Sequence, residues 1–174
     1  MWWAALAATV CTLFDEIWVA TTSTWLWRAG LGEEALGLSA GAFAVGALAG
    51  LAVVERLQWR PETTLLVSAC ALIPAWCLWL ALPPVAAVPV SLLIGAFAAP
   101  LWPLTTALAY ACVPDRPGTV AACLRVVGTL DIVLPLIIGA VADRWGLTGA
   151  LALLLLQPLC VAAVAAQRRC QASP

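Results

Sequence analysis

The longest uncharged run in this sequence extends from Thr63 to Pro114 and contains no Asp, Glu, Lys or Arg. A helix that crosses a bilayer needs about 20 predominantly apolar residues, so this run is too long for a single crossing. Proline lacks a backbone N–H and interrupts helices, so the adjacent Pro83 and Pro84 divide the run. The run therefore predicts two consecutive membrane-spanning helices.

The rest of the chain has the same character. Of all its residues, 64% are hydrophobic and 10% are charged, whereas about 25% are charged in a typical soluble domain. Gly, Pro and charged residues gather in short connectors between the apolar stretches, as expected between helices. We therefore expect an all-α integral membrane protein with one six-helix domain at residues 1–166 and a short tail at 167–174. The expected helices cover approximately residues 3–27, 35–54, 63–82, 87–112, 119–141 and 147–166.

The distribution of arginine predicts the orientation of these helices, because cytoplasmic loops of membrane proteins are enriched in Lys and Arg. With six helices both termini lie on the same side, and that side holds five arginines against two on the other. The five are Arg56, Arg60, Arg116, Arg168 and Arg169, and the two are Arg28 and Arg144. We expect a multi-pass protein of the cell's inner membrane with both termini in the cytoplasm.

Several classes of chemistry are disfavoured by composition. The chain has no histidine, and none of its seven cysteines forms a C-x-x-C pair. Histidine is the usual catalytic base and metal ligand, and paired cysteines mark zinc and redox sites. The formal net charge of −1 gives no sign of a nucleic-acid partner. We therefore expect no metal, no cofactor, no catalytic residues and no nucleic acid, and the lipid bilayer as the surroundings of the chain.

The first expected helix contains two adjacent carboxylates, Asp15 and Glu16, near the middle of its apolar span. An acid at the bilayer centre costs about 2.5–3.5 kcal/mol, so acids within membrane helices are usually functional. At 100° per residue both fall in a polar arc of about 140° that excludes Thr21 and Thr24. The arc comprises Thr9, Thr12, Asp15, Glu16, Thr22 and Ser23. We predict a proton-coupling or cation-recognition site; the structural alternative is an acid pair satisfied by Arg125 or local hydroxyls.

The fifth expected helix carries Arg125 and Asp131, which lie about 120° apart around the helix and about 9 Å apart along it. These two side chains cannot pair with each other, and we predict that they act as coupling or gating partners. Trp18 beside the acids, Trp102 between two prolines and Thr12 are weaker candidates for contact with a solute. Packing in the core accounts equally well for either tryptophan, since tryptophan buries a large apolar area.

Glycines recur at helical spacing in the second expected helix, as Gly37 with Gly41 and, on a different face, Gly46 with Gly50. Small residues let membrane helices approach closely, so we favour packing as the role of these glycines.

A weak internal repeat links two helix ends. Residues 50–56, with Gly50 followed by a Glu-Arg pair, resemble residues 139–144, with Gly139 followed by an Asp-Arg pair. Each segment ends the second helix of a three-helix group, and the two groups would have opposite orientation. This pattern is typical of the inverted repeats found in secondary transporters.

The six-helix pattern, the acid pair and the sequence Gly139-x-x-x-Asp143-Arg144-x-Gly146 together resemble the major facilitator superfamily. In that family the best-known copy of this signature follows the second helix of a half, on the cytoplasmic side. Here the complete copy follows the fifth expected helix, and the second is followed by a degraded copy. The resemblance implies the C-terminal half of a twelve-helix transporter, with helices 1 and 4 lining the cavity, helices 2 and 5 between halves, and a second six-helix half as partner.

The function that the resemblance implies is secondary active transport of a small solute by alternating access, coupled to protons, with no enzymatic activity. Two other classes remain open. One is a membrane scaffold or assembly protein held together by its glycine faces. The other is an intramembrane aspartyl enzyme using Asp15 and Asp131, which is less favoured because the glycine-flanked acid motifs of such enzymes are missing.

Overall fold

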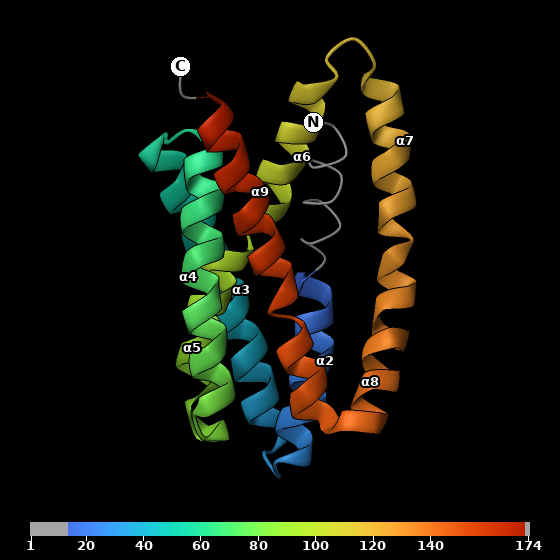
Figure 1. Ribbon diagram of the computed structural model, residues 1–174. Coiled ribbons are helices and arrows are strands. Elements are labelled where there is room, and N and C mark those ends of the chain that lie inside the picture. Colours follow the sequence, from blue (N-terminus) through green and yellow to red (C-terminus); the bar gives the residue numbers. More distant parts are fainter. Residues whose placement is uncertain (1–13, 173–174) are drawn as a thin grey trace.

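The computed structural model describes the backbone of residues 14–172 (Figure 1). Side chains are described over the same range except at 14–16, 127–128, 130–132 and 168–172. Within this part of the chain every regular element is helical, so the predicted all-α class is confirmed. The elements are α2 (Phe14–Arg28), α3 (Glu33–Leu57), α4 (Pro61–Ala81), η1 (Pro84–Ala86), α5 (Ala87–Ala98), α6 (Leu101–Cys112), α7 (Pro117–Gly128), α8 (Leu130–Leu153) and α9 (Leu156–Ala172).

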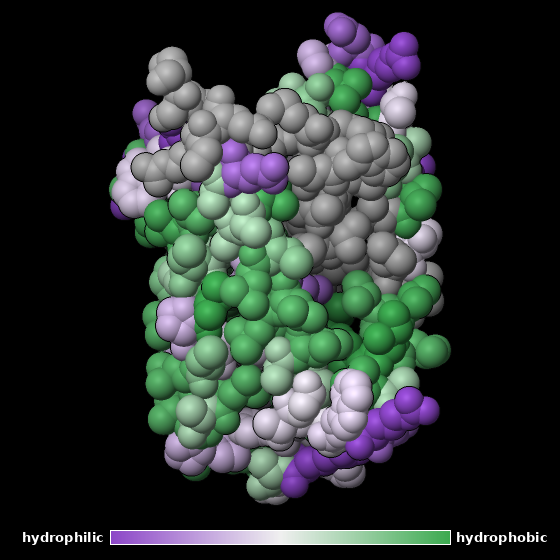
Figure 2. Space-filling model, in the orientation of Figure 1, coloured by the Kyte–Doolittle hydropathy of each residue, from purple (hydrophilic) through white to green (hydrophobic). Residues whose placement is uncertain are grey.

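Four helical stretches within residues 14–172 are long and apolar enough to cross a membrane: Glu33–Leu57, Pro61–Ala81, Pro84–Cys112 and Val133–Gln167. The third combines η1, α5 and α6, because Pro100 between α5 and α6 keeps helical backbone angles (φ −69°, ψ −17°). α5 and α6 run in one direction, α7 and α8 run in the opposite one, and direction otherwise alternates from each helix to the next (Figure 1). On the face drawn in Figure 2, hydrophobic side chains fill the middle and the most hydrophilic ones gather near the two ends.

The fourth stretch is bent sharply at Gly146. This residue has φ 79° and ψ 162°, a conformation that is almost confined to glycine because a Cβ would clash there. At this point the chain ends its downward course in α8, and it then returns upward through α9 (Figure 1). Gly146 therefore reverses the chain direction between two antiparallel helical segments.

The tightest contact in the fold joins α3 to α5. A Cβ added to Gly46 or Gly50 would collide with the backbone carbonyl of Leu92 or Ala96, respectively, and a Cβ on Gly95 would collide with that of Phe43. At one end of the contact the hydroxyls of Ser39 and Ser91 share a buried hydrogen bond of 2.7 Å. The second glycine pair thus serves close helix packing. The first pair, Gly37 and Gly41, faces open space.

An aromatic cluster fills the core between α2, α3 and α4. Trp76 stacks on Trp79 at 5.2 Å between ring centroids, and Trp18 stacks on Phe43 at 4.6 Å. Trp25 packs against Trp79 from about two turns further along α2. The indole N–H of Trp76 donates a hydrogen bond of 3.1 Å to the carbonyl of Leu151. The cluster determines which face of α2 is turned inward.

Candidate functional site

A cavity of about 250 Å³ lies between α2 and α8, and we call it the α2–α8 cleft. Its lining residues recur every three or four positions on both helices, so each helix contributes one continuous face. Ile17, Ala20, Thr21, Thr24 and Arg28 come from α2, and Pro135, Ile138, Gly139, Ala142, Asp143 and Leu147 come from α8.

The cleft stays open because small residues face it from α8. No atom of the described residues lies within 4 Å of the position that a Cβ on Gly139 would take. This is the opposite of Gly50, whose added Cβ would strike the neighbouring helix. The α2–α8 contact is therefore much looser than the α3–α5 contact.

The polar groups of the cleft can bind both a cationic and an anionic group. Thr21 donates its hydroxyl hydrogen to the carbonyl of Ile17 (2.7 Å), and Thr24 donates to that of Ala20 (3.1 Å). The lone pairs of both hydroxyls remain free to accept hydrogen bonds. Arg28 supplies a guanidinium and Asp143 a carboxylate. Among the side chains that the structure describes, no ion pair within 4 Å joins these two charges.

The three acids that we predict to lie inside the membrane are close in sequence to residues that line the cleft. Asp15 and Glu16 belong to the first turn of α2, immediately before Ile17. Asp131 belongs to the first turn of α8, one helical turn before Pro135. The side chains of all three lie outside the described set, and Thr12 precedes the described residues altogether. Their role in proton coupling stays a prediction.

The other predicted residues are widely separated. Trp18 is only 1% exposed and belongs to the aromatic cluster, whereas Trp102 on α6 is 38% exposed at the surface. Arg125, near the end of α7, is exposed. In the signature-like segment, Gly139 and Asp143 line the cleft, Gly146 makes the turn, and Arg144 is exposed outside the lining.

The polar face of α2 differs from the predicted arc. Thr22, which the arc includes, is 3% exposed and its hydroxyl has no hydrogen-bond partner among the described residues. Thr21 and Thr24, which the arc excludes, line the cleft. The physical reason is Trp18, one turn before Thr22, which packs against α3 and α4 and turns that face of α2 into the core. In the sequence, the helical spacing of Thr21, Thr24 and Arg28, three and four residues apart, indicates the face of α2 that lines the cleft.

No three His, Cys, Asp or Glu side chains gather into a possible metal site anywhere in the described set. Comparison with protein-family models, with curated proteins and with solved structures finds no match to this chain.

Proposed function

We propose that the chain is a multi-pass inner-membrane protein and forms a six-helix half of a secondary transporter resembling the major facilitator superfamily. It moves a small solute by alternating access, coupled to protons. The observation that carries this proposal is the α2–α8 cleft, which brings an exposed arginine, an exposed aspartate and two threonine hydroxyls together toward one end of an otherwise apolar helical bundle. Polar groups within apolar helices usually mark a pathway for a solute or an ion.

The pairing of helices supports a 3+3 inverted repeat. For this comparison we group the helices of residues 14–172 into six successive segments: α2; α3; α4; η1 to α6; α7 with α8 up to Trp145; and Leu147 to the end of α9. The main contacts between non-consecutive segments are second with fourth (α3 with α5), first with fifth (α2 with α8) and third with sixth (α4 with α9). Exchanging the two three-segment groups leaves this set of pairs unchanged. That symmetry is expected of an inverted repeat.

Two cavities of equal volume also occupy corresponding positions. One is lined by Gly50, Val53 and Val54 near the end of α3, and the other by Gly139, Ala142 and Asp143 on α8. The spacing from glycine is the same in both sets, and each cavity measures about 250 Å³. Because α3 and α8 end at opposite ends of the bundle, the cavities are near opposite ends (Figure 1). Within this repeat only the second cavity carries charges.

The looseness of the α2–α8 contact gives alternating access a physical basis. The α3–α5 pair is locked by glycine-to-carbonyl contacts, so it moves as a unit. Around Gly139 no such contact holds α8 against α2, so this pair is the one that opens and closes. A small solute with an acidic group near Arg28 and a basic group near Asp143 would bind across the cleft. Asp15, Glu16 and Asp131 then handle the coupled proton.

The test is uptake into proteoliposomes under an imposed pH gradient, with zwitterionic, cationic and anionic small solutes as a panel. Asp15→Asn combined with Glu16→Gln should abolish the pH-driven component of uptake. Glu33→Gln, at an exposed position at the start of α3, is the matched control and should leave uptake unchanged. Equal uptake by the wild type and the double variant would remove the acids from the mechanism.

The cleft itself is tested by Arg28→Gln and Asp143→Asn, which should each weaken uptake of a zwitterion. Arg28→Gln should spare uptake of solutes without an acidic group, and Asp143→Asn should spare uptake of solutes without a basic group. The reason is that each variant changes only one wall of the cleft. Arg144→Gln, next to Asp143 but outside the cleft, is the control. Loss of all solutes alike in both cleft variants would argue against recognition of two charges.

A membrane scaffold is the second candidate, and one observation favours it. Gly37 and Gly41 form an exposed small-residue pair with open space above both. Such pairs allow close helix association in membranes. If the chain is a scaffold, Gly41→Leu changes its native mass in detergent and the wild type shows no flux for any solute. Flux that survives Gly41→Leu would count against this alternative.

A further inference from the structure

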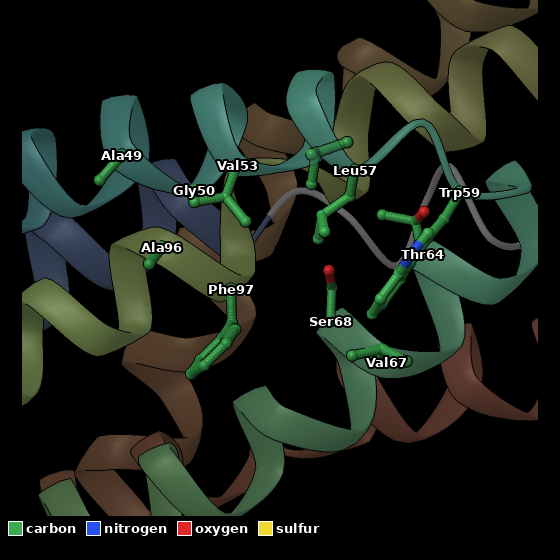
Figure 3. Close-up of a pocket in the computed structure, with 11 residues that line it drawn as sticks. Ala49, Gly50, Val53, Leu57, Trp59, Thr64, Val67, Ser68, Ala96 and Phe97 are labelled. Carbon is green, nitrogen blue, oxygen red and sulfur yellow. The ribbon is translucent and has the colours of Figure 1, made fainter.

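The second large cavity is a groove between α3, α4 and α5, near the opposite end of the bundle from the α2–α8 cleft. We call it the α3–α4 groove; its volume is about 250 Å³ (Figure 3). Val53, Trp59 and Val67 form its rim and are 52%, 47% and 44% exposed. Phe97 and the close Gly50–Ala96 contact close its inner end. The groove is therefore an apolar slot that opens on the outer surface of the bundle.

The shape of this slot limits what can enter. A helix with its side chains is about 10–12 Å across, which is too wide for a space of this volume. A cavity of about 150 Å³ holds a benzene molecule, so the groove has room for a flexible hydrocarbon segment of greater length. Because the proposed membrane surrounds the groove, the hydrocarbon at hand is a lipid acyl chain.

One buried polar group points into the groove. Ser68 is only 6% exposed, and its hydroxyl makes no hydrogen bond to any described residue. Figure 3 shows its oxygen directed into the space between Leu57 and Val67. Thr64 differs, because its hydroxyl donates to the carbonyl of Arg60 at 3.3 Å. The Ser68 oxygen is not among the fully enclosed polar atoms that lack a partner, so it is accessible from the groove. Its hydroxyl can donate a hydrogen bond to an occupant that offers an acceptor.

The outer end of the groove lies at the α3–α4 turn, which carries two arginines. Arg56 is in the last turn of α3, and Arg60 is the residue before α4, directly after the rim residue Trp59. Both are exposed. Glu55 and Glu62 flank them along the chain. Arginines beside grooves between membrane helices bind lipid phosphates. Packing of the acyl chain alone adds little binding free energy, because the chain packs almost as well among the surrounding lipids.

We propose that the α3–α4 groove is a binding site for one diacyl phospholipid. An acyl chain occupies the slot, an ester carbonyl accepts the Ser68 hydroxyl, and the phosphate lies at Arg56 and Arg60. The site rests on the membrane location in the proposed function but not on transport, so failure of the uptake assay leaves it standing.

Native mass spectrometry of the whole chain, released from mild detergent and titrated with dioleoylphosphatidylglycerol, tests the proposal. The wild type should retain one lipid. Ser68→Leu should fill the slot and remove the adduct, and so should Ala49→Phe, which alters an exposed lining position and keeps the test valid if the first variant fails to fold. Neutralising Arg56 and Arg60 to Gln together should weaken retention about 30-fold. Arg116→Gln, outside the groove on the same expected side, should have no effect.

Two further probes separate the parts of the lipid. Dioleoylglycerol has the chains and esters without the phosphate, and it should bind about as weakly as phosphatidylglycerol binds to the double arginine variant. Inorganic phosphate alone should not be retained. Equal retention of lipid by wild type and both slot-filling variants would overturn the proposal. So would binding of dioleoylglycerol to the wild type as tight as that of phosphatidylglycerol, or retention of free phosphate.

Discussion

Alanine at Gly50 should loosen the contact between α3 and α5, whereas alanine at Gly41 on the same helix should not. The added methyl group at Gly50 meets the backbone carbonyl of Ala96, which no side-chain rotation can move away. The two helices must therefore separate. At Gly41 the same methyl group enters open space.

The expected size of the effect follows from three terms. Overpacking a tight contact costs about 1–3 kcal/mol. Separation of the helices also stretches the Ser39–Ser91 hydrogen bond, and such bonds in membrane proteins contribute about 0.6 kcal/mol on average. Replacing glycine by alanine inside a helix returns about 1 kcal/mol. The net loss for Gly50→Ala is then about 0.5–2.5 kcal/mol, against a gain of up to about 1 kcal/mol for Gly41→Ala.

Thermal unfolding in detergent, followed by circular dichroism at matched protein concentration, measures the difference. For a chain of this size each kcal/mol corresponds to about 2–4 °C in the midpoint. Gly50→Ala should therefore melt about 1–10 °C below the wild type, and Gly41→Ala at or above it. Gly46→Ala, which meets the carbonyl of Leu92, should behave like Gly50→Ala. Equal midpoints for Gly41→Ala and Gly50→Ala would refute the tight α3–α5 contact.

Two other stability predictions use matched positions. Trp76→Phe removes the hydrogen bond to the carbonyl of Leu151 and should cost about 0.5–1.5 kcal/mol more than Trp79→Phe, whose indole N–H has no described partner; equal midpoints in the same melting assay would contradict the bond. Gly146→Ala should destabilise the chain by about 1–3 kcal/mol because φ 79° with ψ 162° is almost closed to other residues. Gly139→Ala, in open space, should leave the free energy of unfolding unchanged or higher, and a destabilised Gly139→Ala would show that the α2–α8 cleft is closed.

The positions where helices begin and end follow from local chemistry. Pro61 starts α4, and Pro83 and Pro84 separate α4 from α5, because proline cannot donate the backbone hydrogen bond that a helix interior needs. The bend at Gly146 also follows from local chemistry, since only glycine adopts its backbone angles without strain. Long apolar stretches bounded by such residues also predict spanning helices without any knowledge of their neighbours.

The rotation of each helix about its axis was decided only by the tertiary structure. Both glycine pairs of α3 are equally suited to close packing, yet only Gly46 and Gly50 meet a partner, because Gly95 lies opposite them on α5. On α2 the cleft takes Thr21 and Thr24 rather than Thr22, because Trp18 packs into the aromatic cluster. A helix that is apolar on nearly every side has no hydrophobic face to orient it, so its sequence determines where it spans and its neighbours determine where it points.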